Sequence, residues 1–116
     1  MTPTNPLSTL PHHKLQAYGL ALELVRLVSS IAIGDAHLRK QARKSAASGA
    51  LNTAEGAARP SRADKSRIYG IALGEVCEAA AAVEIAGALG CCRPADVERV
   101  MKHAERVKNV LSRLIR

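Results

Sequence analysis

Aromatic residues are almost absent from this 116-residue sequence, which contains no Phe, no Trp and two tyrosines, Tyr18 and Tyr69. Proteins that hold single-stranded nucleic acid stack its bases on aromatic side chains, so the composition argues against that mode of binding. Hydrophobic residues still make up 47% of the chain, which leaves Ala, Leu, Val and Ile to build a core. Such a composition is typical of helical proteins.

The sequence also lacks the features of a secreted or membrane protein. Two of its three cysteines are adjacent, at Cys91 and Cys92, and neighbouring cysteines seldom pair because the ring that they close is strained. No signal-peptide pattern opens the chain, and no apolar run is long enough to span a bilayer. We therefore expect a soluble, cytoplasmic protein.

Apolar side chains recur at three- and four-residue intervals along most of the chain and predict four helices. The expected helices cover residues 12–32, 36–58, 61–89 and 94–116. Residues 1–11 carry three prolines among polar residues and are expected to form a flexible lead-in. Short turns between the helices predict one all-α domain over residues 12–116, an antiparallel up-down-up-down four-helix bundle.

Residues at the expected helix ends support these boundaries. Gly34 followed by Asp35 predicts a helix stop and then an N-cap, because glycine tolerates positive φ and Asp accepts hydrogen bonds from free amides. Ser61 and Asp64 resemble a capping box that starts the third helix. Gly90 is the expected C-cap of that helix.

Each helix has a face that we expect to be buried. On residues 36–58 this face is a ridge of small residues that lets a neighbouring backbone approach: Ala42, Ala46, Gly49, Thr53 and Gly56. On the third helix the expected inward residues are Ile68, Ile71, Ala72, Val76, Ala79, Val83 and Ala86. On the fourth they form a coiled-coil-like seam: Val97, Val100, Ala104, Val107, Leu111 and Leu114.

Positive charge is the main chemical signal. The formal net charge of +7 and the pI of about 9.8 predict a field that attracts polyanions. On the fourth helix a row without acids lies opposite the apolar seam and consists of Arg99, Lys102, Arg106, Asn109, Arg113 and Arg116. An ordinary solvated face is the alternative interpretation of this row, although such faces usually mix charges.

A second group of basic residues begins the 36–58 helix, where cations oppose the helix dipole, and consists of Arg39, Lys40, Arg43 and Lys44. The following turn adds Arg59, Arg62, Lys65 and Arg67. The third helix instead carries Glu75, Glu78 and Glu84 without a base after Arg67. This asymmetry favours self-association as well as polyanion binding.

Enzymatic and metal-binding patterns are missing. A di-metal bundle needs paired Glu-x-x-His elements, and the four histidines and three cysteines have no zinc-ligand spacing. Cys77 is interpreted as a packing residue, and Gly70 and Gly74 as close-packing positions. We expect no catalytic residue, no metal and no cofactor.

Two segments of the second helix carry a family resemblance: residues 41–48, Gln-Ala-Arg-Lys-Ser-Ala-Ala-Ser, and residues 52–56, Asn-Thr-Ala-Glu-Gly. Downstream matches are Ser61, Arg67, Ala72-Leu73-Gly74, Glu78 and Leu89-Gly90. In order and spacing these residues resemble the four-helix-bundle family encoded in 23S ribosomal RNA intervening sequences, over residues 12–116. The chain departs from that family at Ala50, where Pro is usual, and at Lys65 and Ile68, where Phe is usual.

The resemblance implies an assembly. The family is distantly similar to the accessory protein of diversity-generating retroelements, a basic pentameric barrel that engages a reverse transcriptase and nucleic acid, which implies a homopentamer here. Gly56, Gly74 and Glu78 are matched motif positions. Asn52 and Glu55 are interpreted as a buried polar pair that meets Arg43 or Arg67 and fixes helix register or a subunit interface. A ligand or catalytic role for the pair is the alternative.

These observations lead to a non-enzymatic, oligomeric protein that binds the backbone of structured RNA or DNA. Its expected nucleic-acid-binding residues are Arg39, Lys40, Arg43, Lys44, Arg59, Arg62, Arg67, Arg99, Lys102, Arg106 and Arg113. The alternative is an oligomeric scaffold whose basic face binds an acidic protein partner such as a reverse transcriptase.

Overall fold

The structure, a computed structural model, describes residues 10–115. Its elements are the 3₁₀ turn η1 (Pro11–Lys14) and the helices α1 (Gln16–Ser30), α2 (Ala36–Ala58), α3 (Arg62–Ala88) and α4 (Pro94–Leu114). No strand occurs within residues 10–115, so the predicted all-α fold of four helices is confirmed. Most of the expected lead-in, residues 1–9, lies outside the described residues, as does Arg116 of the basic row.

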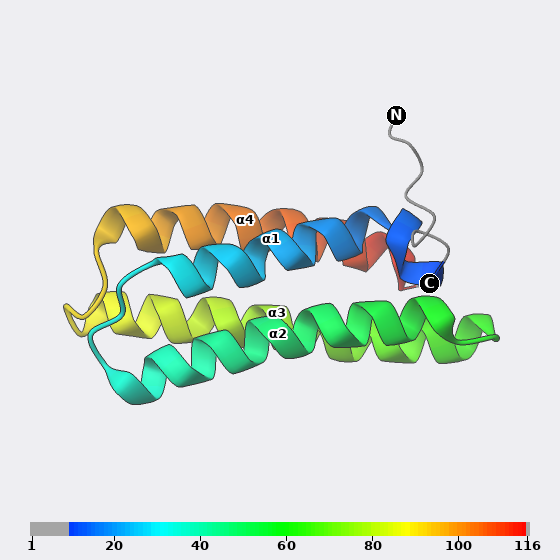
Figure 1. Ribbon diagram of the computed structural model, residues 1–116, viewed down its shortest axis with the longest axis horizontal. Coiled ribbons are helices and arrows are strands. Elements are labelled where there is room, and N and C mark those ends of the chain that lie inside the picture. The colour runs from blue at the N-terminus through cyan, green and yellow to red at the C-terminus, as the bar shows by residue number, and fades with distance from the viewer. Residues whose placement is uncertain (1–9, 116) are drawn as a thin grey trace.

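The four helices lie alongside one another, and the chain reverses direction at each turn between them (Figure 1). α1 packs against α2 and α4, and α3 packs against the same two helices. The α1–α2 and α3–α4 turns meet at one end, where the Gly34 amide donates a 2.7 Å hydrogen bond to the Cys91 carbonyl. The α2–α3 turn lies at the opposite end, near the start of α1 and the end of α4 (Figure 1).

The core lies between the helices and is built from aliphatic side chains. Its largest fully buried members include Leu24, Val28, Val76, Val100 and Leu111. Within residues 10–115, every helix falls short of the length or the apolar character that crossing a bilayer requires.

α2 and α3 share the most extensive interface because α2 presents small residues to it. All five members of the predicted ridge, Ala42, Ala46, Gly49, Thr53 and Gly56, are buried, which confirms that prediction. A Cβ atom on Gly49 would lie 3.1 Å from a methyl group of Val76, and one on Gly56 would lie 2.7 Å from the ring of Tyr69. Larger residues at these two positions would therefore force the helices apart.

Three of the predicted caps are present. The Asp35 carboxylate accepts a 2.8 Å hydrogen bond from the Leu38 amide, and the Ser61 hydroxyl accepts one of 3.1 Å from the Asp64 amide. Gly90 has a φ of 76°, and the next amide, that of Cys91, donates back to the Ala86 carbonyl at 2.8 Å. These local bonds explain why α2 and α3 begin, and why α3 ends, close to the predicted residues.

The prediction for the first helix was wrong at both ends. Residues 11–14 form η1, and Leu15 is extended, so α1 begins at Gln16 and not at residue 12. α1 ends at Ser30, where the next residue, Ile31, is extended; Ile31 and Ile33 are buried and Ala32 between them is exposed. Burial of the two isoleucines takes precedence over continuing the helix. Gly34 lacks the positive φ expected of a helix stop.

Several expectations for α3 were also wrong. Ile71 was predicted to face the core but is 43% exposed, and Cys77, interpreted as a packing residue, is exposed. A Cβ atom on Gly70 or Gly74 would have no contact within 4 Å, so neither is a close-packing position within this chain. The reason is that α3 is apolar on two sides, and the core uses one of them.

Candidate nucleic-acid interface

The basic row of α4 lies on the outside of the molecule. The seam of this helix is directed inward, with Val100, Ala104, Val107 and Leu111 buried, and Val97 and Leu114 half-buried. At 100° per residue the opposite side carries the basic row, and every described member of it is exposed: Arg99, Lys102, Arg106, Asn109 and Arg113. The row therefore runs along α4 from Arg99 to Arg113.

Flanking acids neutralise the first half of this row but not the second. Arg99 contacts Asp96 at 3.2 Å, and Lys102 contacts Glu98, four residues earlier, at 3.6 Å. The Lys102–Glu98 pair is exposed on both sides, and such pairs are worth about 0.2–1 kcal/mol and open readily, whereas Asp96 is largely buried. Among residues 10–115, Arg106 and Arg113 have no acidic partner. The second half of α4 carries the less compensated charge.

The four basic residues at the start of α2 line a shallow surface hollow. The two arginines bind main-chain carbonyls, whereas the two lysines are exposed. The Arg39 guanidinium donates to the Ile33 carbonyl at 2.8 Å, and that of Arg43 donates to the Ser29 carbonyl at 3.3 Å. Both arginines thus bind carbonyls at or just beyond the end of α1, which lack helical partners. Lys40 and Lys44 are exposed and have no acidic partner within the described chain.

The basic residues around the α2–α3 turn are largely engaged in local structure. Arg59 forms an ion pair with Glu55, and Arg67 lies 4.0 Å from Asp64. The Lys65 ammonium donates to the Ala57 carbonyl at 2.7 Å, which caps the end of α2. Arg62 is exposed and without an acidic partner in residues 10–115.

The structure does not bring all predicted binding residues into one site. The α2 start and the α2–α3 turn lie at opposite ends of α2 (Figure 1), roughly 30 Å apart at 1.5 Å per residue. α2 contacts α1 and α3, whereas α4 lies across the molecule from it. The three basic groups are therefore separate surfaces, and the α4 row is the longest of them.

The motif residues of α2 form contacts other than those predicted. Asn52 donates to the Ser48 carbonyl at 2.9 Å, one turn earlier in its own helix. Glu55 pairs with Arg59, and no ion pair or hydrogen bond joins Asn52 or Glu55 to Arg43 or Arg67 within residues 10–115; a role of the pair at a subunit interface stays a prediction. Arg59 lies one helical turn after Glu55, and its guanidinium pairs with the Glu55 carboxylate. Glu78 instead accepts a 2.6 Å hydrogen bond from the Gln41 amide of α2 and so joins α2 to α3.

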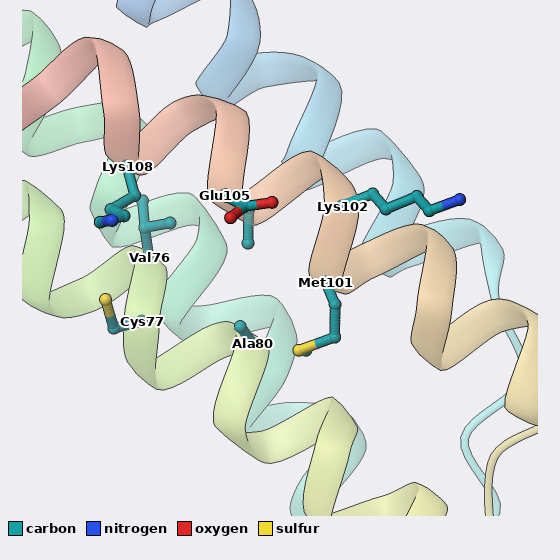
Figure 2. Close-up of a pocket in the computed structure, with 8 residues that line it drawn as sticks. Val76, Cys77, Ala80, Met101, Lys102, Glu105 and Lys108 are labelled. Atoms are coloured by element: carbon teal, nitrogen blue, oxygen red, sulfur yellow. The ribbon is translucent and has the colours of Figure 1, made fainter.

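A pocket of about 400 Å³ lies between α3 and α4 (Figure 2). Val76, Ala80 and Met101 give it apolar walls, and Cys77, Glu105 and Lys108 also line it. In Figure 2 the Lys102 side chain extends away from the other labelled residues. Ligand sites usually combine apolar walls with several convergent polar groups. Its charged lining residues Glu105 and Lys108 are exposed to solvent, so we assign the pocket no ligand.

The titratable groups with shifted pKa values are both interior. Burial raises the pKa of Tyr69, which packs against Gly56. Burial and then the charge of Asp96 raise the pKa of Cys92, which keeps this thiol protonated. No three His, Cys, Asp or Glu side chains in residues 10–115 are grouped as a metal site requires.

The sequence did not predict that Arg39, Arg43 and Lys65 donate hydrogen bonds to main-chain carbonyls. Their partners lie in a different helix or turn, and no local pattern in the sequence marks them. It also missed His103, whose Nε2 lies 2.9 Å from the Leu20 carbonyl and links α4 to α1.

A family model described as 23S rRNA-intervening sequence protein matches residues 13–113, a range that includes most or all of every helix. A search of curated proteins gave no match.

Proposed function

This chain belongs to the family of 23S rRNA-intervening sequence proteins, and from that premise we propose that it is a non-enzymatic accessory protein that binds structured RNA or DNA. The α4 row is its principal contact surface. The observation that carries this proposal is the exposed second half of that row, where Arg106 and Arg113 have no acidic partner in residues 10–115. Unpaired cations of this kind bind phosphates and release counterions.

Recognition proceeds through backbone phosphates and the shape of the nucleic acid, because the chain has no Phe or Trp, Tyr69 is buried and Tyr18 is half-buried. A helix with basic side chains along most of one side suits a duplex or a folded RNA more than a single strand. Such contacts position a protein on nucleic acid without reading its sequence. Lys40 and Lys44 are a second, smaller source of unpaired charge.

We propose that the protein works as a homo-oligomer, and the family resemblance implies a pentamer built from up-down-up-down bundles. Several copies would present several α4 rows to one nucleic acid, and linked weak contacts add to a much higher apparent affinity. The exposed apolar residues Leu51, Ile71 and Ile85 support an assembly of copies.

The test compares two double variants of equal charge. Arg106→Gln with Arg113→Gln removes two unpaired cations of the row, whereas Lys14→Gln with Arg26→Gln removes two exposed cations outside all three basic groups. Fluorescence anisotropy with a structured RNA and a DNA duplex, measured from low to moderate salt, gives the affinities. The α4 variant should lower the slope of log K against log salt by about 0.7–0.9 per lost phosphate contact. The control variant should lower it less.

Equal losses in the two variants would show that net charge alone attracts the nucleic acid. Affinity that does not change with salt, or no binding at low salt, would refute the proposal. Circular dichroism verifies the fold of both variants, which alter exposed side chains only.

A scaffold that binds an acidic protein is the second candidate, because the α4 row suits an acidic surface as well as phosphates. Purification of the tagged protein from its native host, with and without nuclease, separates the two functions. A partner protein that stays bound after nuclease treatment, together with no RNA or DNA affinity in vitro, favours the scaffold.

A further inference from the structure

The outer side of α3 is largely apolar and exposed to solvent, although its Glu78 accepts a hydrogen bond from Gln41 of α2. Its exposed residues follow an alternating three- and four-residue spacing, and we name this set the α3 outer seam: Ile71, Gly74, Glu78, Ala81, Ile85 and Ala88. Ile71 is 43% and Ile85 is 50% exposed. A helix that is apolar on two sides is typically buried on both of them.

Two glycines, Gly70 beside this seam and Gly74 within it, are not required by packing inside the chain. Glycine in a helix interior costs about 1 kcal/mol relative to Ala. At Gly70 and Gly74 an added Cβ atom would meet nothing within 4 Å, in contrast to Gly49 and Gly56, which lie against α3. A backbone that approaches α3 from outside the chain would require glycine here.

A second uncovered apolar surface lies between α1 and α2, and we name it the α1–α2 groove. It has a volume of about 340 Å³ and is lined by His12, Tyr18, Leu22, Val25, Ala47, Ala50, Leu51 and Ala54. Leu51 stands at the groove with 71% of its surface exposed. Large exposed leucines next to an apolar hollow mark interaction sites.

Acidic residues lie on and beside the α3 outer seam, whereas exposed lysines lie beside the α1–α2 groove. Glu78 lies in the α3 outer seam and Glu84 is exposed on the same helix, and no base occurs between residues 68 and 92. On α2, Lys40 and Lys44 precede Ala47 and Leu51 along the same helical row, and both lysines are exposed. Pairing the seam with another seam would bring like charges together, whereas pairing it with the groove brings opposite charges together.

We propose that the α3 outer seam of one copy docks into the α1–α2 groove of a second copy. This inference rests on the self-assembly described under the proposed function and names the surfaces that carry it. Because the two surfaces differ, every copy binds one neighbour with its seam and the other with its groove. Such a head-to-tail contact closes into a ring if the rotation permits. α4 belongs to neither surface, so its basic row stays free for nucleic acid.

The test blocks one surface at a time in the full-length protein. Gly74→Leu fills the open space on the seam, and Leu51→Glu puts a charge beside the groove. Light scattering after size-exclusion chromatography should give the mass of one chain for each variant alone. An equimolar mixture should give the mass of two chains, because each variant retains the surface that the other has lost. Gly19→Leu, at an open helix position outside both surfaces, and Ser112→Glu on α4 are the matched controls and should assemble as the unaltered chain does.

The docking proposal is wrong if Gly74→Leu assembles normally, or if both variants are monomeric and their mixture stays monomeric. It is also wrong if Gly74→Leu is monomeric while Leu51→Glu still assembles, which would indicate that seam meets seam. An unaltered chain that is monomeric at high concentration refutes self-assembly itself. Nucleic-acid affinity of the same samples is a separate readout, since salt-dependent binding by a monomer would leave the α4 proposal standing.

Discussion

Gly56 of α2 and Tyr69 of α3 are in direct contact, and a Cβ atom on the glycine would come within 2.7 Å of the tyrosine ring. Tyr69 is 4% exposed, so its ring has little freedom to move aside. The contact explains why α2 carries a small residue at this level of the helix. It also makes this the tightest glycine contact between α2 and α3.

Gly56→Ala should therefore destabilise the protein although alanine favours helices. We expect a loss of about 1–3 kcal/mol from the added methyl group in a packed interface. Gly19→Ala is the matched control, because Gly19 also lies inside a helix but has open space around it, and it should gain up to about 1 kcal/mol. Urea unfolding followed by circular dichroism measures both. Equal effects of the two substitutions would contradict the close contact.

The N-cap of α2 gives a second prediction. Asp35→Ala removes the oxygen that accepts the 2.8 Å hydrogen bond from the Leu38 amide and should cost about 1 kcal/mol. Asp35→Asn keeps an acceptor at the same place and should cost much less. Thermal unfolding at low and high salt separates the hydrogen bond from the charge, because salt screens only the charge. An Asn variant as unstable as the Ala variant would disprove the capping role.

The helices were largely predictable because their ends depend on local chemistry. Asp35, Ser61 and Gly90 act through bonds to amides or carbonyls only a few residues away, and the sequence shows both partners. The start of α1 was not predictable, because η1 folds across α2 and its boundary depends on that long-range contact.

The candidate site was less predictable than the fold. Periodicity placed the α4 row outside, since a strongly amphipathic helix has only one apolar side to bury. α3 has two apolar sides, so periodicity alone could not decide whether Ile71 faces the core. The division of the α2 group into bound arginines and free lysines depends on carbonyls at the end of α1, which no spacing within α2 indicates.

The different roles of the arginines and the lysines at the start of α2 give a third prediction. Arg39→Gln removes the donor to the Ile33 carbonyl and should destabilise the protein by about 1 kcal/mol or more, because the carbonyl loses a charged partner. Lys40→Gln removes the same charge from an exposed side chain and should change the unfolding free energy by less than about 0.5 kcal/mol. Chemical denaturation of the two variants measures the difference. If they are equally stable, Arg39 is only a surface charge.

The cysteines give a prediction about pH. Burial and the nearby Asp96 carboxylate raise the pKa of Cys92 above its ordinary value of 9.0, so the folded protein holds the thiol proton more tightly than the unfolded chain does. The stability from this group is complete below pH 9.0 and is lost as pH rises above it. As pH rises above 9.0, the free energy of unfolding should therefore fall more steeply in the unaltered chain than in Cys92→Ala. Cys77→Ala is the control and should follow the unaltered chain, because Cys77 is exposed.

The same two cysteines should also differ in reactivity. Iodoacetamide at pH 8 should modify the exposed Cys77 well before Cys92, because Cys92 is buried with a raised pKa and the thiolate is the reactive form. Peptide mass spectrometry measures the two rates, and faster labelling of Cys92 would show that its thiol is neither buried nor held protonated.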